Sequence, residues 1–210
     1  MARYNTANKQ KYLRGDIISR WHLRSVMEAV YSLVAQTNPR TVLDAGCGEG
    51  FVSKYLADRD PSLEILGVDV SPDAIRYAQE NFGDAAGFQA GSILSLPFKD
   101  NSFDTVVCSE VLEHISELEL AVTELKRVAR TYVVISVPNE PYFKWINDFA
   151  RAIRFSQDPG HVNFWTHSEF RAFIESRFFA PQFSRKHVIY QLAVAAVQNG
   201  AVVPANASIS

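Results

Sequence analysis

The sequence lacks the features that mark secreted, membrane-spanning and fibrous proteins. Only two of its 210 residues are cysteine, too few for a disulfide framework, so Cys47 and Cys108 indicate a reducing compartment. No uninterrupted apolar run reaches the about 18 residues that cross a bilayer. Residues 1–16 are polar and have no apolar core of the kind found in a signal peptide. These absences predict a cytoplasmic protein without a transmembrane segment.

An excess of charge of one sign is also lacking. The chain carries 21 basic and 23 acidic side chains, with a formal net charge of −2, so its composition does not indicate a nucleic-acid-binding protein. Hydrophobic residues make up 47% of the chain and charged residues 21%, which are ordinary values for a globular protein with a full core. The length is that of one domain.

Charge is nevertheless distributed unevenly along the chain. Residues 1–24 carry six basic side chains and one acidic, and residues 144–187 carry seven basic and four acidic. Residues 25–143 between them carry eight basic and 18 acidic side chains. Two interpretations stay open: chance clustering on a solvated surface, or a basic rim that attracts an anionic partner.

Apolar patterning predicts alternating strands and helices. Apolar side chains recur with a period of about 3.6 in residues 20–36, which is typical of an amphipathic helix. Within residues 103–109, the run Val106-Val107-Cys108 is continuously apolar, which is typical of parallel strands buried on both faces. This alternation predicts an α/β fold with a doubly wound, mostly parallel sheet and helices on both faces. Strands are expected at residues 41–46, 64–69, 87–92, 103–109, 132–137 and within 180–198.

Three of the predicted helices begin at recognisable capping sequences. Ser71 precedes Pro72, and proline is well suited to the first helical position because its missing amide hydrogen has no partner to lose there. Residues 116–119 (Ser-Glu-Leu-Glu) and residues 166–169 (Thr-His-Ser-Glu) each match a capping box. Both boxes predict a helix start with reciprocal side-chain hydrogen bonds.

A glycine-rich loop, residues 42–50 (VLDAGCGEG), follows the first predicted strand. Its glycines let the backbone turn tightly and approach a ligand. Asp69 ends the second strand, where a carboxylate accepts hydrogen bonds from the hydroxyls of a ribose. A dinucleotide-binding fold shares both features, but its fingerprint is Gly-x-Gly-x-x-Gly, whereas the spacing here is Gly-x-Gly-x-Gly. Asp44 inside the loop would repel a pyrophosphate and suits a cationic amino group.

In combination, three segments resemble the class I S-adenosylmethionine-dependent methyltransferases. They are the glycine loop, residues 92–104 (SILSLPFKDNSFD) and residues 109–115 (SEVLEHI), and the resemblance extends over residues 41–138. It implies a seven-stranded, Rossmann-like sheet and S-adenosylmethionine as the cofactor.

The resemblance also implies a domain organisation. Residues 1–200 would form a single methyltransferase domain, with residues 139–167 as an insertion on the substrate side. Residues 201–210 are mostly small, and we expect them to form a flexible tail.

The resemblance implies a role for individual residues toward the cofactor. Asp44 would act on the ammonium group, Asp69 on the ribose hydroxyls, and Val70 on adenine. Ile93 would offer its backbone N–H to adenine. Ser92 stands where the family often has aspartate, so it would bond to the adenine amino group without charge assistance. The implied cofactor-binding set is Asp44, Gly46, Cys47, Gly48, Asp69, Val70, Ser92, Ile93, Ser109 and Glu110.

Candidates for the chemistry follow the fourth and fifth strands, at the sheet edge where open α/β folds bind ligands. His114 and His161 are the candidate catalytic bases. Glu110, Glu113, His114 and His161 also resemble the metal-binding pattern of ubiquinone-biosynthesis O-methyltransferases and small-RNA 2′-O-methyltransferases. A metal-free site is the preferred interpretation, because the same turn occurs in metal-free relatives. The full candidate list is Glu110, Glu113, His114, Glu140, Tyr142, His161, Asn163 and Trp165.

The expected function is methyl transfer to a small-molecule acceptor, at oxygen, by in-line displacement. An RNA 2′-O-methyltransferase and a non-catalytic cofactor-binding partner subunit are the alternatives. The basic segments and the apolar side chains Phe143, Trp145, Ile146 and Phe149 favour an anionic or lipid-linked acceptor. The oligomeric state, the acceptor and the need for a metal stay open at this point.

Overall fold

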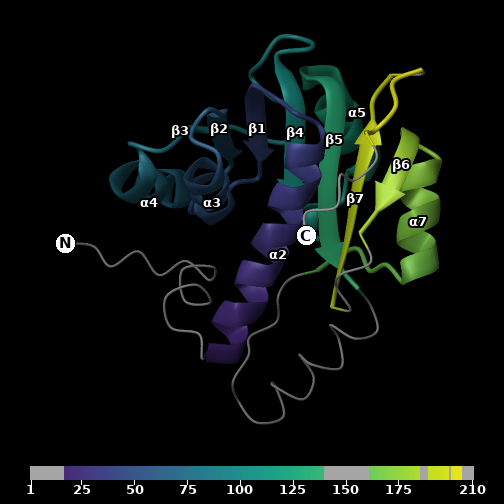
Figure 1. The fold of residues 1–210 in the computed structure, drawn as a ribbon, viewed down its shortest axis with the longest axis horizontal. Helices are drawn as coiled ribbons and strands as arrows, with labels where there is room; N and C mark the ends of the chain where they lie inside the picture. Colours follow the sequence, from purple (N-terminus) through teal and green to yellow (C-terminus); the bar gives the residue numbers. More distant parts are fainter. Residues whose placement is uncertain (1–16, 140–160, 185–188, 199, 205–210) are drawn as a thin grey trace.

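The computed structural model describes residues 17–139, 161–184, 189–198 and 200–204. In the described residues, four helices, five strands and one 3₁₀ turn come before a final helix and a hairpin, and Figure 1 shows their arrangement. Among the described residues, no helix is both long and apolar enough to cross a membrane. The elements are α2 (Ile17–Gln36), β1 (Thr41–Ala45), α3 (Phe51–Arg59), β2 (Glu64–Asp69), α4 (Pro72–Phe82), β3 (Gly87–Ala90), β4 (Phe103–Ser109), the 3₁₀ turn η1 (Leu112–His114), α5 (Leu118–Val128), β5 (Ala129–Pro138), α7 (His167–Glu175), β6 (Phe179–Phe183) and β7 (Tyr190–Ala196).

The seven strands form one sheet in the order β3-β2-β1-β4-β5-β7-β6. The first five strands are parallel, and β7 joins antiparallel to both β5 and β6. Strand order reverses between β1 and β4, so the crevice that binds ligands in open α/β sheets lies outside their carboxyl ends. The predicted fold class is confirmed.

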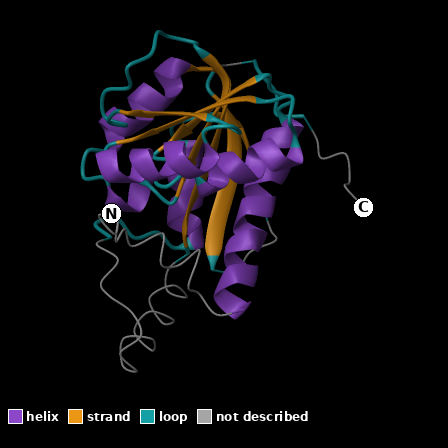
Figure 2. Ribbon diagram, turned by 90° about the vertical axis from the view of Figure 1, so that its left-hand side faces the viewer, coloured by secondary structure: helices purple, strands orange, loops and turns teal. Residues whose placement is uncertain are grey.

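Helices cover both faces of this sheet, as Figure 2 shows. Side chains alternate between faces along a strand, so neighbours Val106 and Val107 are buried in two different cores. One core lies under α2, α3 and α4, and the other under α5 and α7. The strands are apolar on both faces because both faces are covered.

The helix caps agree with the sequence in two cases and differ in one. Ser71 accepts a hydrogen bond from Ala74 N, with Pro72 following it, and Thr166 forms both bonds of its capping box with Glu169. The capping box expected at residues 116–119 is wrong: α5 begins at Leu118 without a side-chain cap. Glu119 is instead bonded to Arg177, so its carboxylate is drawn away from the helix start.

Residues 201–204, the first part of the expected tail, contact the sheet. Val203 is only 1% exposed, and the backbone oxygens of Val202 and Val203 accept hydrogen bonds from Tyr132 and Gln182. Residues 201–204 are therefore held against the sheet by apolar burial and side-chain donors. Residues 205–210 lie outside the described residues, as do residues 140–160 of the expected insertion, with Glu140, Tyr142 and the apolar side chains at 143–149.

Candidate functional site

The carboxyl ends of β1 and β2 place the glycine loop beside two carboxylates. The loop turns sharply: Gly46, Gly48 and Gly50 all have positive φ, at 84°, 51° and 82°. The amides of Gly46 and Cys47 both donate to Val68 O, at 2.7 and 3.0 Å, which ties the loop to β2. A Cβ on Gly46 would lie 2.4 Å from Val111 Cγ2. Only glycine fits this close approach to the segment after β4.

Asp44 lies near the end of β1 and is 2% exposed. Ser53, on α3, donates a 2.6 Å hydrogen bond to Asp44 Oδ2. Burial raises the pKa of Asp44 to about 6; the bond from Ser53 opposes this shift, and the charge of Asp69 adds to it. A buried carboxylate with a second carboxylate nearby is suited to a cationic group, since a cation would favour its ionised form.

Asp69 ends β2, and its two carboxylate oxygens accept backbone hydrogen bonds from the glycine loop and from the start of α4. Gly48 N donates to Oδ2 at 2.9 Å, and Ser71 N donates to Oδ1 at 2.8 Å. The next residue, Val70, is 73% exposed although it is apolar. An acid with fixed orientation and an exposed apolar side chain beside it are the features expected for a ribose and a purine ring.

The segment after β3 is brought to the same place by backbone pairing. Gly91 N donates to Asp69 O at 2.9 Å, so Ser92 and Ile93 follow directly beside the acid. Ser92 Oγ accepts a 3.2 Å bond from Leu94 N within its own turn, and the Ile93 side chain is buried at 8% exposure. Ile93 therefore contributes its side chain to the core, which leaves its backbone as the part suited to a ligand.

Cys47 is held in the glycine loop by its backbone, and its side chain points into the core. Its side chain is buried in the core under α3 and α4, and burial raises the pKa of its thiol far above the ordinary value. The thiol is thus a packing group and not a nucleophile.

Ser109 and Glu110 lie at the end of β4, across the loop. Ser109 Oγ is 2.7 Å from Ser136 Oγ on β5. Glu110 has a positive φ of 57°, uncommon for a residue with a side chain, and Tyr190 Oη donates to its Oε2 at 3.3 Å. Such conformations persist where neighbouring structure holds them, which is common at functional sites.

The two candidate bases, His114 and His161, lie close together at η1, the turn that follows β4. The His114 and His161 ring centroids are 4.9 Å apart, and one ligand-type atom from each of Glu113, His114 and His161 lies within 4.8 Å of the others. Glu113 is buried at 1% exposure. Among the described residues Glu110 is not part of this cluster, so the structure assembles three of the four residues of the candidate metal set.

The segment that carries His161 is fastened to η1 by the backbone. The amides of Val162 and Asn163 donate to Glu113 O at 2.8 and 3.0 Å. The Asn163 side chain donates to Leu112 O and Ile115 O at 2.9 and 2.6 Å. Asn163 therefore fastens this segment to η1, because its side-chain amide hydrogens are used by backbone carbonyls. Trp165 is likewise a core residue, at 7% exposure.

Sequence patterns missed two residues of this site. Ser53 holds Asp44, and Tyr190 holds Glu110. A polar residue on the buried side of the helix that follows the glycine loop is a signal for Ser53. No sequence pattern indicates a role for Tyr190, since its position is that of the first residue of an apolar strand.

Known proteins resemble the chain in sequence and fold. Residues 43–135 match the family described as "Methyltransferase domain". The uncharacterized methyltransferase YcgJ of Bacillus subtilis is 31% identical over 150 residues, covering 67% of this chain and 57% of that protein. Demethylmenaquinone methyltransferase of Thermus thermophilus is 30% identical over 145 residues, covering 66% and 63%. The solved structure of magnesium protoporphyrin IX methyltransferase from Synechocystis PCC 6803, with bound SAH, has a TM-score of 0.67 at 20% identity, covering 92% and 95%.

An open α/β sheet with a glycine loop after β1 and an acid after β2 defines a Rossmann-like nucleoside-binding fold. Residues 43–135 carry the methyltransferase domain, and the chain is similar in sequence and fold to class I S-adenosylmethionine-dependent methyltransferases. It spans less than two thirds of the length of both curated relatives.

Proposed function

We propose that this protein is an S-adenosylmethionine-dependent methyltransferase that methylates an oxygen of a small-molecule acceptor. The observation that carries the proposal is the pair of carboxylates on either side of the glycine loop. Asp44 is buried and bonded to Ser53, and Asp69 is bonded to the loop amide of Gly48. The loop between them excludes side chains, since a Cβ at Gly46 would collide with Val111.

These residues fit the chemical groups of the cofactor. Asp44 would hold the ammonium group, directly or through water, because a buried carboxylate favours a cationic partner. Asp69 would accept from the ribose hydroxyls, and Val70 would cover one face of adenine. Ser92 and the Ile93 amide would meet the adenine edge, and Ser109 and Glu110 would line the methionine side. When bound, S-adenosylmethionine supplies an electrophilic methyl group.

The chain's own contribution to the chemistry is orientation and proton removal. A hydroxyl acceptor must lose its proton during transfer, and a histidine is suited to take it near neutral pH. His114 and His161 lie together at this edge of the sheet, with ring centroids 4.9 Å apart. The bonds from segment 161–163 to η1 fix where His161 stands. This pair favours oxygen as the acceptor atom.

The acceptor class is supported by charge and by one relative. The Thermus thermophilus relative is named for a small molecule, demethylmenaquinone. The net charge of −2 does not favour an RNA acceptor, the principal alternative. The basic segments, residues 1–24 and 144–187, favour an acceptor that carries carboxylate or phosphate, on an apolar stem where the aromatic residues of the second segment would meet it.

A methyl-transfer screen tests the proposal. The protein is incubated with methyl-labelled cofactor and, separately, a small-metabolite extract, a lipid extract and total RNA. We expect label in a metabolite or lipid fraction, released under acid conditions that cleave O-methyl bonds and leave N-methyl and C-methyl bonds intact. Label confined to RNA would favour the alternative acceptor, and no label in any fraction, with cofactor bound, would favour a non-catalytic subunit.

A further inference from the structure

A cavity of about 340 Å³ lies between α7 and the β6–β7 hairpin, the elements at one end of the sheet in Figure 1. This volume is at the lower end of the range for small-molecule sites. Polar side chains form much of its wall, together with two phenylalanines. The lining residues that matter here are Asn139, Arg171, Phe183, Ser184, Tyr190 and Gln191.

The cavity adjoins the candidate site through Tyr190. Tyr190 lines the cavity and also donates to Glu110, the residue that follows β4. Asn139 follows the carboxyl end of β5, and its amide donates to Ile189 O at 2.7 Å, beside the start of β7. One side chain thus separates the cavity from the residues assigned to the methionine side of the cofactor. The cavity lies at the same edge of the sheet.

Gln191 carries an unused hydrogen-bond acceptor in this wall. The residue is 4% exposed, and its Nε2 donates to Trp165 O at 2.9 Å. Its Oε1 is buried and accepts from none of the described residues. A buried acceptor without a donor destabilises the fold. A ligand hydroxyl or N–H in the cavity would supply the missing donor.

Arg171 gives the cavity a positive charge. Its guanidinium carbon lies 4.3 Å from the centroid of the Phe183 ring, and Nη1 bonds to Glu175 Oε1 at 2.8 Å. The side chain is 47% exposed. No carboxylate belongs to the described lining, although Glu175 pairs with Arg171 and Glu110 accepts from Tyr190. A guanidinium has five N–H donors, so one ion pair leaves donors for an anionic ligand group.

We infer that this cavity binds the methyl acceptor, and that the acceptor is a small organic anion bearing a hydroxyl group. The carboxylate or phosphate bonds to Arg171, a ring or apolar stem contacts Phe183, and a hydroxyl other than the one that is methylated donates to Gln191. This inference rests on the proposed function in one respect, namely that the bound ligand is the one that accepts the methyl group. The binding site itself is defined by the cavity and does not depend on methyl transfer.

Three matched probes test the ligand chemistry. They are 4-hydroxyphenylacetate, phenylacetate, which lacks the hydroxyl, and tyrosol, which has an alcohol in place of the carboxylate. Binding is measured by calorimetry and by saturation-transfer NMR at millimolar concentration, with and without S-adenosylhomocysteine. We expect 4-hydroxyphenylacetate to bind at least about fivefold more tightly than either other probe, since each lacks one of the two recognised groups. No binding of 4-hydroxyphenylacetate, or equal binding of all three, overturns the inference.

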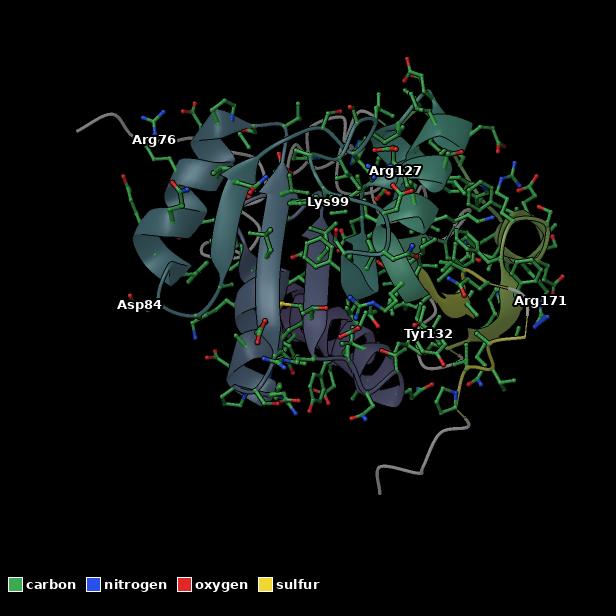
Figure 3. All side chains as sticks on the ribbon, turned by 90° about the horizontal axis from the view of Figure 1, so that it is seen from above. Arg76, Asp84, Lys99, Arg127, Tyr132 and Arg171 are labelled. Atoms are coloured by element: carbon green, nitrogen blue, oxygen red, sulfur yellow. The ribbon has the colours of Figure 1, made fainter. Side chains whose placement is uncertain are left out.

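Variants test the location. Arg171→Gln should weaken 4-hydroxyphenylacetate about fivefold and leave tyrosol unchanged. Ser184→Phe fills the cavity from another side and should abolish binding of all three probes. Arg76→Gln is the matched control, because Arg76 is also an exposed helical arginine paired on its own helix, and Figure 3 places it at the opposite end of the molecule from Arg171. Equal loss in Arg76→Gln, or no loss in Ser184→Phe, overturns the location.

Each variant is also titrated with S-adenosylhomocysteine. If the wild-type protein does not bind that ligand, the proposed function fails while the probe results still decide the cavity. If it binds S-adenosylhomocysteine but none of the probes, only the inference about the cavity fails.

Discussion

The hydroxyl of Ser53 donates a 2.6 Å hydrogen bond to Oδ2 of Asp44, and both side chains are buried. Asp44 lies on β1 and Ser53 on α3, so the bond joins the strand that enters the glycine loop to the helix that leaves it. It gives the buried carboxylate a fixed orientation and favours its ionised form. Ser53 is therefore a positioning residue for the cofactor site.

Replacing Ser53 by alanine should weaken cofactor binding. Asp44 would lose its donor and its pKa would rise further, so less of the carboxylate would be ionised. We expect S-adenosylhomocysteine to bind roughly five- to tenfold less tightly at neutral pH, which corresponds to the about 1 kcal/mol that a typical hydrogen bond contributes. Ser32→Ala is the control, because that hydroxyl donates only to its own helix, at Glu28 O. Equal affinities for the two variants would remove the assigned role of Ser53.

Cofactor affinity should rise with pH in the acidic range. The pKa of Asp44 is raised to about 6, and an ammonium group binds its ionised form. Protons therefore compete with the ligand below that pKa, and near pH 5 only about a tenth of the carboxyl groups are ionised. We expect Kd for S-adenosylhomocysteine to be about tenfold larger near pH 5 than near pH 7.5. Asp44→Asn should flatten this dependence, and a wild-type Kd that is constant over the range contradicts the assignment of Asp44.

Gly46→Ala should reduce stability through two separable effects. The positive φ of 84° disfavours a side chain, by about 1 kcal/mol. The collision with Val111 adds an overpacking cost of about 1–3 kcal/mol. Gly200→Ala is the control for the first effect alone, because Gly200 has a φ of 90° and nothing within 4 Å of the added Cβ. Urea unfolding should show a larger loss for Gly46→Ala, partly restored by Val111→Ala. Equal losses for the two glycine variants would show that the close contact contributes nothing.

The fold was predictable because its signals are local. Apolar runs, turn residues and caps such as Ser71-Pro72 lie within a few positions of each other, and their order limits the topology. The capping box predicted at residues 116–119 does not form, because Glu119 is bonded to Arg177, 58 positions further on. No local pattern reports a partner that only the tertiary fold brings near.

The residues of the candidate site likewise fall into those that local sequence patterns predict and those that they do not. Asp44, Gly46 and Asp69 were predictable because each lies at a strand end, and parallel strand ends meet at one edge. Tyr190 and Gln191 were not, because β7 pairs antiparallel with β5 at long range and its sequence reads as an ordinary apolar strand. The hydrogen bonds from Asn163 to η1 could not be predicted either, since an asparagine in a loop is equally typical of a ligand-binding group.

Chelation of metal should leave methyl transfer intact. The structure gathers Glu113, His114 and His161, but Glu110 bonds to Tyr190 and stands outside that cluster among the described residues. With an acceptor from the screen, we expect EDTA-treated protein to keep its activity and His161→Ala to lower kcat about a hundredfold, as loss of a general base does. One carboxylate and two imidazoles are also suitable metal ligands. Activity lost in EDTA and restored by Mn²⁺ or Mg²⁺ would make the cluster a metal site.

Calorimetric titration with S-adenosylhomocysteine is the direct test of the cofactor site. We expect one binding site on the wild-type protein and a loss of roughly 1.5–3 kcal/mol in Asp69→Ala, the scale of a hydrogen bond to a charged group. Asp73→Ala is the matched control, because Asp73 lies four residues on and pairs with Arg76 at the surface; it should bind like the wild type. No binding to the wild-type protein, or equal affinity in Asp69→Ala while the fold is intact, would contradict the account.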